Sequence, residues 1–426
     1  MMRIVDKMKA PVYEKLLSLK KEKLAEMYSL CFESTWETTL QRLDGTVFLI
    51  TGDIPAMWLR DSSAQVYHYL PFADKYDEVR EAIELMLKRQ FKYITLDPYA
   101  NAFNKEANNN CYERDDTNYA PGAMAWIWER KYEIDSLCYP IRLAYGFWKK
   151  TGCSAWCDET FIKAAENIIS VWETEQHHCE KSPYYFNRAH CPESDTLPCG
   201  GKGNPVAYTG MTWSGFRPSD DACKYGYLVP ANFFAKKSLE QLGEILEALC
   251  PGSELIARAK KLHDDIPGGL AAHAVVEHPQ FGSVYAYEVD GNGNYHIMDD
   301  AIVPSLLSLP YLGCIAADDP VYRNTRRMLL SKANPYYYEG SAAKGIGSPH
   351  TPENYVWPIS LCLQGLTSTD QDELLALADT LSSIDAGTNL MHEGVNVDNP
   401  AEFTRPWFAW ANSIFSEFVE KAVQYM

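Results

Sequence analysis

Apolar residues recur at helical spacing over most of this 426-residue chain. Residues three and four positions apart share a helix face, so such a stripe predicts an amphipathic helix packed on a core. One stripe predicts a single helix near the N-terminus and comprises Tyr13, Leu16, Leu17, Leu24, Met27, Tyr28 and Cys31. Others fall at 83–94, 239–249, 374–384 and 408–422. We expect an all-α fold of about ten to twelve helices, and no solenoid, because no fixed-period repeat occurs.

Long polar loops separate these helices, roughly over 97–121, 177–230, 267–300, 331–355 and 385–406. Loops of this length in a compact domain usually carry function. Residues 283–298 alternate like a strand around the turn Asp290-Gly-Asn-Gly-Asn294, which predicts a minor β-hairpin. No tract has the composition of a linker. The pattern therefore predicts one domain over residues 1–426, built as a closed double ring of helices with a site at one end.

The segment 51–65 joins turn chemistry to the start of a predicted helix. It reads Thr-Gly-Asp-Ile-Pro-Ala-Met-Trp-Leu-Arg-Asp-Ser-Ser-Ala-Gln. Gly52 permits backbone angles that other residues avoid. Ser62 and Ser63 are expected to cap a helix that enters at Ala64.

Within this segment, Trp58, Arg60 and Asp61 form a combination that suits a sugar. The apolar face of a sugar ring stacks on an aromatic side chain. Its hydroxyls accept hydrogen bonds from arginine and donate them to aspartate. The alternative is a structural ion pair beside a core tryptophan.

The composition limits the kinds of molecule that this chain is expected to bind. Aromatic residues make up 13% of the chain, with 11 Trp and 27 Tyr, an excess that suits carbohydrate stacking. The net charge is −18 and the pI is about 5.0, which disfavours nucleic acid and anionic membranes. We therefore expect a substrate that is neutral rather than anionic, and leave the oligomeric state open.

Cysteine usage and hydropathy bear on location. No apolar run of 18 residues occurs, and no apolar signal core follows the first ten residues. The 12 cysteines include no CxxC pair, and their scatter is typical of small core residues in a reducing compartment. We therefore expect a cytoplasmic protein without a membrane span.

Two adjacent carboxylates end the loop Gly215-Phe-Arg-Pro-Ser-Asp220-Asp221. Neighbouring carboxylates raise each other's proton affinity, and nearby aromatic residues lower the local dielectric constant. A carboxyl that stays protonated at neutral pH can act as a general acid. The alternative is an aspartate at a helix N-cap beside a solvated one.

A third carboxylate, Glu393, lies in the loop His392-Glu-Gly-Val-Asn396. Gly394 lets the backbone approach a ligand closely. A carboxylate beside histidine and asparagine can orient a water molecule. The alternative is a loop glutamate in a salt bridge with Arg405.

Metal sites find little support in the sequence. His177, His178, Cys179, Cys191 and Cys199 lack zinc-ligand spacing. The residues Asp290, Asn292 and Asn294 imitate the start of a calcium loop, but Ala301 stands where its glutamate belongs. We expect no metal and no cofactor.

Three motifs in order, 51–62, 216–221 and the Glu393 loop, resemble glycoside hydrolase family 125. That family comprises metal-independent exo-α-1,6-mannosidases of bacteria and fungi, and the resemblance extends over nearly the whole chain. It implies an (α/α)6 barrel with long functional loops. It also implies an inverting reaction on a mannose-containing oligosaccharide, with Asp220 as general acid and Glu393 as general base.

Further residues lie in or beside the same loops and are candidate sugar contacts. Besides Trp58, Arg60 and Asp61, they are Asp115, Asp116, Asp299, Asp300, His350, Trp357 and Arg405. Each has a structural role as its alternative.

Three other functions stay open. A sugar epimerase on the same barrel would transfer protons through histidines such as His278, His296 and His350. A phosphorylase would need a cation for phosphate near Glu393, and Arg405 is the nearest in sequence. A non-catalytic glycan-binding protein would not depend on the carboxylates.

Overall fold

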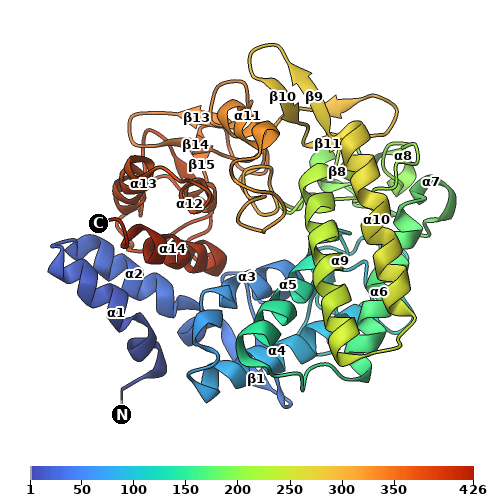
Figure 1. Cartoon of the computed structure of the whole chain (residues 1–426), viewed down its shortest axis with the longest axis horizontal. Helices are drawn as coiled ribbons and strands as arrows, with labels where there is room; N and C mark the ends of the chain where they lie inside the picture. Colours follow the sequence, from blue (N-terminus) through green and yellow to red (C-terminus); the bar gives the residue numbers. More distant parts are fainter. Residues whose placement is uncertain (1) are drawn as a thin grey trace.

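The chain winds once around a ring of helices (Figure 1). The computed structural model describes residues 2–426. Its α-helices are α1 Ile4–Ser18, α2 Glu22–Ser34, α3 Leu59–Tyr67, α4 Asp77–Leu96, α5 Ile134–Thr151, α6 Glu159–Glu175, α7 His178–Lys181, α8 Pro198–Gly201, α9 Val229–Leu249, α10 Leu255–His273, α11 Pro320–Leu329, α12 Pro358–Leu366, α13 Gln371–Ser383 and α14 Ala409–Ala422. Two of these fourteen, α7 and α8, have four residues each, so the longer helices of the described chain agree with the predicted number.

Five helices form an inner ring in the packing order α9, α5, α3, α14, α12. An outer layer of α4, α6, α10, α13 and α2 packs against these helices and against one another. The apolar stripes explain this arrangement, since the stripes of α4, α9, α13 and α14 are mostly buried. The ring closes where α2 packs against α14 and α13, which joins the two ends of the chain (Figure 1).

Residues 301–315 occupy the place where a sixth inner helix would stand, between α10 and α11. They form turns rather than a helix, because prolines at 304 and 310 lack an amide proton. The Tyr139 hydroxyl from α5 donates to the Val303 carbonyl at 3.3 Å, and the Tyr311 hydroxyl donates to Glu417 of α14 at 3.0 Å. These contacts complete the inner ring, and the predicted (α/α)6 barrel is confirmed.

Two predicted boundaries are wrong. The N-terminal stripe is divided between α1 and α2, because Lys20 adopts a left-handed backbone angle of φ 56° and ends the first helix. The loop expected from residue 267 begins only after α10, which contains Pro267. Burial of Ile266 and Leu270 outweighs the backbone hydrogen bond that the proline removes.

The predicted start of the helix after Trp58 is also wrong. Helix α3 begins at Leu59 rather than Ala64, and its first amide donates to the Asn101 carbonyl at 3.1 Å. A neighbouring loop therefore satisfies the helix start without a serine cap. Ser62 and Ser63 lie inside the helix and donate to carbonyl oxygens of the preceding turn at 2.6 and 2.9 Å. Arg60 and Asp61 consequently belong to the first turn of α3.

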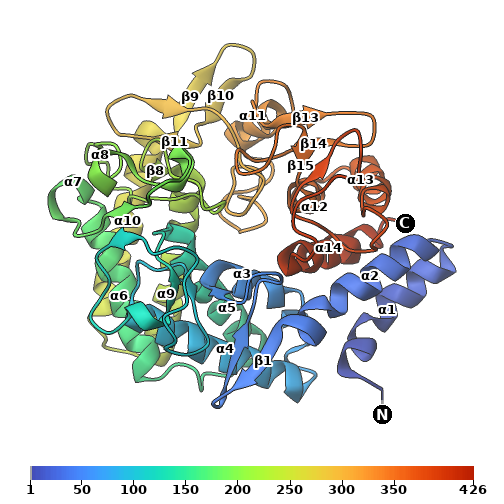
Figure 2. The same ribbon diagram turned by 180° about the vertical axis from the view of Figure 1, so that it is seen from behind.

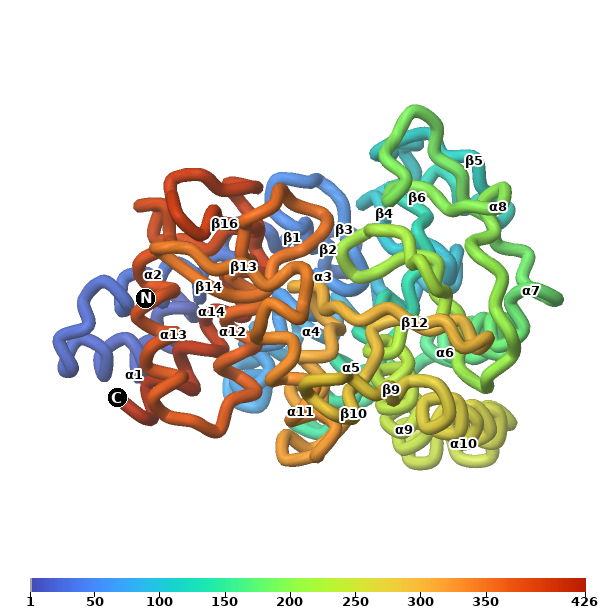
Figure 3. Tube along the Cα trace, turned by 90° about the horizontal axis from the view of Figure 1, so that it is seen from above, coloured from blue at the N-terminus to red at the C-terminus, as the bar shows by residue number. Residues whose placement is uncertain are grey.

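The strands are short and pair only antiparallel. They are β1 Leu40–Leu43, β2 Thr46–Leu49, β3 Met57–Trp58, β4 Ala102–Phe103, β5 Asp116–Thr117, β6 Ile127–Glu129, β7 Phe186–Asn187, β8 Tyr227–Leu228, β9 Val275–His278, β10 Gly282–Tyr285, β11 Glu288–Val289, β12 Tyr295–His296, β13 Tyr337–Glu339, β14 Lys344–Ile346, β15 Tyr355–Val356 and β16 Val395–Asn396. The loops that carry β4, β5 and β6 lie in front of the helices when the ring is seen from behind (Figure 2), and these strands share one edge of the molecule in Figure 3.

The predicted β-hairpin is confirmed as β11 and β12. One oxygen of the Asp290 carboxylate accepts the backbone amides of Asn292 and Asn294, at 2.8 and 3.0 Å. The other accepts the Asn294 side-chain amide at 2.7 Å. The carboxylate is therefore used to hold a tight turn, as an Asx turn does.

Candidate active site

A cavity of about 650 Å³ opens at the end of the ring where inner helices begin. Arg60 reaches it from the first turn of α3, while Trp357 and Phe408 reach it from the residues that precede α12 and α14. Of the residues predicted from the sequence, eight line this cavity: Trp58, Arg60, Asp61, Asp220, His350, Trp357, Glu393 and Arg405. The parallel direction of the inner helices thus gathers motifs that lie far apart in the sequence.

Arg60 is buried and surrounded by four carboxyl groups. Its Nη1 lies 2.6 Å from Glu133 and 3.2 Å from Asp135, both in the entry to α5. Its Nε lies 3.4 Å from Asp61, and its Nη2 lies 3.6 Å from Asp220. All three guanidinium nitrogens therefore contact these carboxyls, which supports a structural role for Arg60.

Asp61 and Trp58 line the cavity side by side with Arg60. Asp61 Oδ2 is shielded and lies 3.4 Å from Arg60 Nε without a well-aligned hydrogen bond, and Nε1 of Trp58 is also shielded and unpaired. Burial raises the pKa of the Asp61 carboxyl, although Arg60 and Arg405 oppose that shift. Both side chains line the cavity, and a carboxylate beside an aromatic ring is suited to meet a hydroxylated ligand.

Asp220 is held at the cavity edge by a strained turn. Its φ is 69°, a left-handed value that aspartate tolerates better than most residues. Its amide donates to the Arg217 carbonyl at 2.9 Å, and its own carbonyl accepts Lys131 Nζ at 2.7 Å. Asn101 donates to its Oδ1 at 3.3 Å, while a quarter of the side chain stays exposed. The carboxyl is fixed from behind and accessible from the cavity.

The sequence predicted that the adjacent Asp221 would keep Asp220 protonated, and this reason is wrong. Burial does favour the protonated form, but the charges of Arg60 and Lys131 and a hydrogen bond with Glu133 lower the pKa of Asp220. Burial raises the pKa of Glu133 well above its usual range. Burial therefore favours the protonated form of Glu133, whereas the neighbouring cations favour the ionised form of Asp220.

Asp221 does not act on Asp220 as adjacency in sequence suggested. Its Oδ1 lies 3.1 Å from Nδ1 of His350, so its side chain is engaged elsewhere. Burial alone would lower the pKa of His350, but the hydrogen bond to Asp221 and the charges of Glu393 and Asp220 raise it to about 9. His350 is therefore a cation beside the cavity at neutral pH.

Glu393 lines the same cavity in a mostly buried position, with 10% of its side chain exposed. Its Oε1 lies 3.5 Å from Arg405 Nη1, so the structure contains the salt bridge that was considered as the alternative role of Glu393. Arg405 is held more closely by Asp53, at 2.5 Å. The neighbouring His392 is stacked on Phe403 with ring centroids 3.9 Å apart and does not line the cavity.

Gly52 explains how the motif at 51–55 meets the Glu393 loop. Its φ is 133°, and a Cβ atom there would collide with the Trp407 carbonyl. The amide of Asp53 donates to that same carbonyl at 3.1 Å. Only glycine permits this approach, and the approach brings the Asp53 carboxylate to Arg405.

Four predicted sugar contacts lie outside the cavity lining, and each has protein partners. Asp115 pairs with Arg188 at 2.7 Å, and Asp116 on β5 faces Tyr185 and Asn187 at 3.3 Å. Asp299 accepts two backbone amides, at 2.8 and 2.9 Å. Asp300 accepts the Ser219 hydroxyl at 2.6 Å and so braces the loop before Asp220.

A buried charged segment, Glu129 to Asp135, was not predicted from the sequence. Lys131 lines the cavity together with Glu129, Arg188 and Asp195. Arg188 binds Glu129 at 2.9 Å and Asp195 at 3.0 Å. The run Trp-Glu-Arg-Lys-Tyr-Glu-Ile-Asp at 128–135 resembles a solvated face, and its only signal is a charge density that no helical stripe accounts for.

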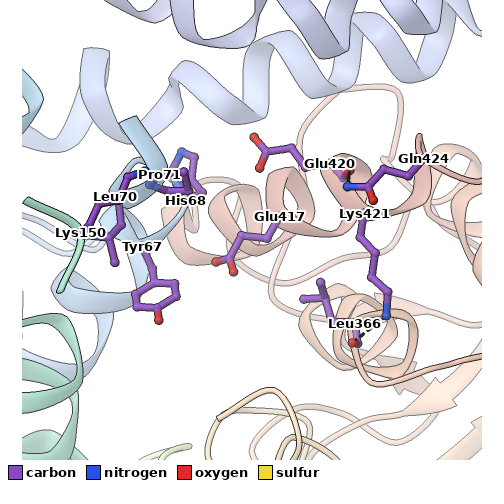
Figure 4. Close-up of a pocket in the computed structure, with 10 residues that line it drawn as sticks. All are labelled: Tyr67, His68, Leu70, Pro71, Lys150, Leu366, Glu417, Glu420, Lys421 and Gln424. Atoms are coloured by element: carbon purple, nitrogen blue, oxygen red, sulfur yellow. Dashed lines mark hydrogen bonds between the residues drawn. The ribbon is translucent and has the colours of Figure 1, made fainter. Parts of the chain in front are cut away.

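A second cavity of about 530 Å³ lies at the other end of the ring (Figure 4). The ends of α3, α12 and α14 line it with Tyr67, Leu366, Glu417 and Glu420 among others. Burial raises the pKa of both glutamates to about 7. Their partners are Tyr311 and Tyr28, so these carboxyls are held by the protein itself.

Within residues 2–426, no cluster of three His, Cys, Asp or Glu side chains has metal-binding geometry. His178, in the rejected zinc motif, stacks on Trp213 and binds Glu175 at 2.6 Å. In the same part of the chain, no helix is long and apolar enough to cross a bilayer.

Comparisons with known proteins agree with this geometry. The family model of metal-independent α-mannosidases, GH125, matches residues 21–420. A Streptococcus pneumoniae protein of a family of metal-independent α-mannosidases, solved in a non-productive complex with α-1,6-mannobiose, is 45% identical. The match covers 99% of this chain and 98% of that one, with a TM-score of 0.95.

More distant relatives were also found. The meiotically up-regulated gene 157 protein of Schizosaccharomyces pombe is 41% identical over 424 residues, which cover 94% of this chain and 82% of that protein. The glucoamylase of Saccharomycopsis fibuligera is 10% identical with a TM-score of 0.58, and the match covers 96% and 95% of the two chains. At that identity the likeness concerns the fold alone.

Proposed function

This chain belongs to glycoside hydrolase family 125, the metal-independent α-mannosidases, and from that premise we propose that it releases α-1,6-linked mannose from non-reducing ends with inversion of configuration. The protein is thus a glycoside hydrolase. The linkage is supported by the α-1,6-mannobiose bound to the Streptococcus pneumoniae relative. The observation that carries the chemistry is that Asp220 and Glu393, from separate loops, line one cavity.

In the proposed reaction, Asp220 protonates the glycosidic oxygen while Glu393 removes a proton from a water molecule on the opposite face of the sugar. Inversion needs room for that water, so the two carboxyls should stand about 6.5–9.5 Å apart around the substrate. Arg60 fixes the acid from behind, and Asp61 with Trp58 meets the terminal sugar.

The alternatives find less support. An epimerase needs a histidine that accepts a proton, whereas His350 is held protonated by Asp221 and its surroundings. His278 and His296 do not line the cavity. A phosphorylase needs a free cation, whereas Arg405 already binds Asp53 at 2.5 Å and lies 3.5 Å from Glu393.

The decisive experiment follows product anomers by proton NMR. The protein is incubated with α-1,6-, α-1,2-, α-1,3- and α-1,4-linked mannobiose. We expect release of mannose from the α-1,6 isomer, with β-mannose as the first product. α-Mannose as the first product would mean retention, which places the carboxyls nearer 5–5.5 Å and makes Glu393 a nucleophile. No mannose from any isomer would favour a glycan-binding protein.

We also propose a cytoplasmic location. All twelve cysteines are free thiols in the structure. A reducing compartment keeps thiols in that state. Fractionation of the source cells with an antibody to the protein tests this.

A further inference from the structure

Glu133 is fully buried immediately before α5 and has one satisfied and one unsatisfied oxygen. Its Oε2 accepts from Arg60 Nη1 at 2.6 Å and from the Ser136 hydroxyl at 2.7 Å. Its Oε1 is shielded from solvent and receives no hydrogen from any donor in the protein. A buried carboxylate oxygen without a donor is costly. The position therefore calls for a proton on that oxygen.

Glu133 and Asp220 lie against the two terminal nitrogens of the same guanidinium, 2.6 Å from Arg60 Nη1 and 3.6 Å from Arg60 Nη2. Two ionised carboxylates only accept hydrogen bonds, so carboxyls gathered on one guanidinium are favoured when one proton lies between them. The charge balance leads to the same conclusion. Four carboxyls surround the single guanidinium of Arg60, and full ionisation would place four negative charges around one buried positive charge.

Other charged groups face this pair from every neighbouring element. They are Arg60 and Asp61 of α3, Asp135 of α5, Glu129 and Lys131 at the end of β6, and His350 after β14. Lys131 also forms an ion pair with Asp195, so its positive charge acts on Asp195 as well as on Asp220. Asp220 alone, next to Arg60, Lys131 and the His350 cation, would be an anion at neutral pH.

We propose that Glu133 is the positioning residue that keeps Asp220 supplied with its acidic proton: the two carboxyls hold one proton in common, and Glu133 gives it up when substrate binds. This inference rests on the proposed function. In the free protein the proton lies on Glu133. When the glycosidic oxygen occupies the cavity beside Asp220, the proton is carried by Asp220, and Glu133 becomes the anion that Arg60 and Ser136 hold. The charge of the pair does not change in this step.

The bond between the anomeric carbon and the leaving oxygen breaks, and its electron pair stays on that oxygen, which takes the proton of Asp220. A water oxygen bonds to the anomeric carbon and loses a proton to Glu393. Glu393 afterwards releases this proton to solvent, and the pair takes one up from solvent.

The test is Glu133→Gln, which keeps the size of the side chain and its hydrogen bonds but removes the exchangeable proton. On α-1,6-mannobiose we expect kcat/KM to fall by about 10²–10³-fold. The alkaline limb of its pH profile should move to lower pH by about one unit or more, because Asp220 then titrates alone beside two cations. On a 2,4-dinitrophenyl α-mannoside, whose leaving group needs no proton, activity should stay within about fivefold of wild type.

Two further variants make the result specific. Glu133→Asp keeps a titratable carboxyl and should restore much of the alkaline limb. Asp135→Asn alters a carboxyl on the same Arg60 nitrogen, at 3.2 Å, and any loss should be equal on both substrates. The thermal unfolding midpoint of each variant reports whether it folds.

The outcomes separate this inference from the proposed function. If wild type releases no mannose, or Asp220→Asn keeps full activity on mannobiose, the proposed function fails. If those hold but Glu133→Gln retains the wild-type pH profile, only the inference is overturned. It is also overturned if Glu133→Gln loses activity equally on both substrates, or if Asp135→Asn shows the same dependence on the leaving group.

Discussion

Asp220 and Glu393 are assigned to opposite faces of the sugar, so their variants should fail in different ways. Asp220→Asn removes the proton donor, and activity on α-1,6-mannobiose should fall about 10²–10⁴-fold. A dinitrophenyl mannoside should recover part of that loss. Glu393→Gln removes the base that activates water, so the same substrate should not rescue it. Steady-state kcat/KM on the two substrates checks both expectations. Rescue of both variants, or of neither, would contradict the assignment of roles.

Asp61 lines the cavity with a carboxylate beside Trp58, which predicts selection of the terminal sugar by its hydroxyls. A site built to bind a hydroxyl discriminates by up to about 10⁴-fold against its loss. Asp61→Ala should therefore depress kcat/KM by several orders of magnitude while the protein stays folded. The matched control is Asp116→Ala, an exposed aspartate outside the cavity, which should stay within about threefold of wild type. Equal activity of the two variants would mean that Asp61 is structural.

At the residue scale, sequence motifs identified the two carboxyls that face the cavity but not the reason for their behaviour. Asp220 was expected to gain its proton affinity from Asp221, yet Asp221 binds His350 at 3.1 Å and the proton partner is Glu133. Glu133 stands 87 positions before Asp220. No local pattern reveals such a pair. The packing of α3 on α5 brings Glu133 beside Arg60, and the separate loop at 215–221 brings Asp220 there.

At the element scale, apolar stripes predicted α4, α9, α13 and α14 well, because burial on one face determines the period. They failed where tertiary contacts override local preference. The start of α3 depends on a carbonyl of Asn101, and α10 continues through Pro267. The segment 301–315 carries no stripe and still completes the inner ring.

Helix α14 carries two glutamates whose pKa is raised to about 7 by burial at the far end of the ring. A carboxyl whose pKa is higher in the folded state binds its proton more tightly there. Its contribution to stability is complete below pH 4.5 and is lost as pH rises through about 7. The free energy of unfolding should therefore decline between about pH 5 and pH 8, by roughly 1–3 kcal/mol for each group.

Glu417→Gln tests this decline. The amide can still accept from Tyr311 but does not ionise, so Tm should fall less between pH 5.5 and pH 8 than in wild type, by a few degrees. The control is Glu240→Gln, a change in an exposed glutamate of α9 that pairs with Lys237. Differential scanning calorimetry at several pH values checks both. An unchanged pH dependence in Glu417→Gln would show that this carboxyl does not titrate on unfolding.

At the scale of the whole molecule, the ring brings residues that are far apart in the sequence close together in space. The inner helices run in one direction, so the residues that begin α3, α12 and α14 share one cavity, and those that end the same helices share another. The closed ring was predictable from alternating stripes and long loops. Which loop side chains face the cavity was not, and Asp115, Asp116, Asp299 and Asp300 have protein partners instead.

The proposed reaction moves two protons, one from Asp220 and one to Glu393, and such a pair needs no Lewis acid. The matching family is described as metal-independent. Prolonged treatment with EDTA, followed by removal of the chelator on metal-free resin, should therefore leave kcat and KM for α-1,6-mannobiose within error of the untreated protein. Metal analysis of the treated sample is the control. A loss of activity that calcium or zinc restores would mean that a cation takes part, and the two-carboxyl mechanism would have to be abandoned.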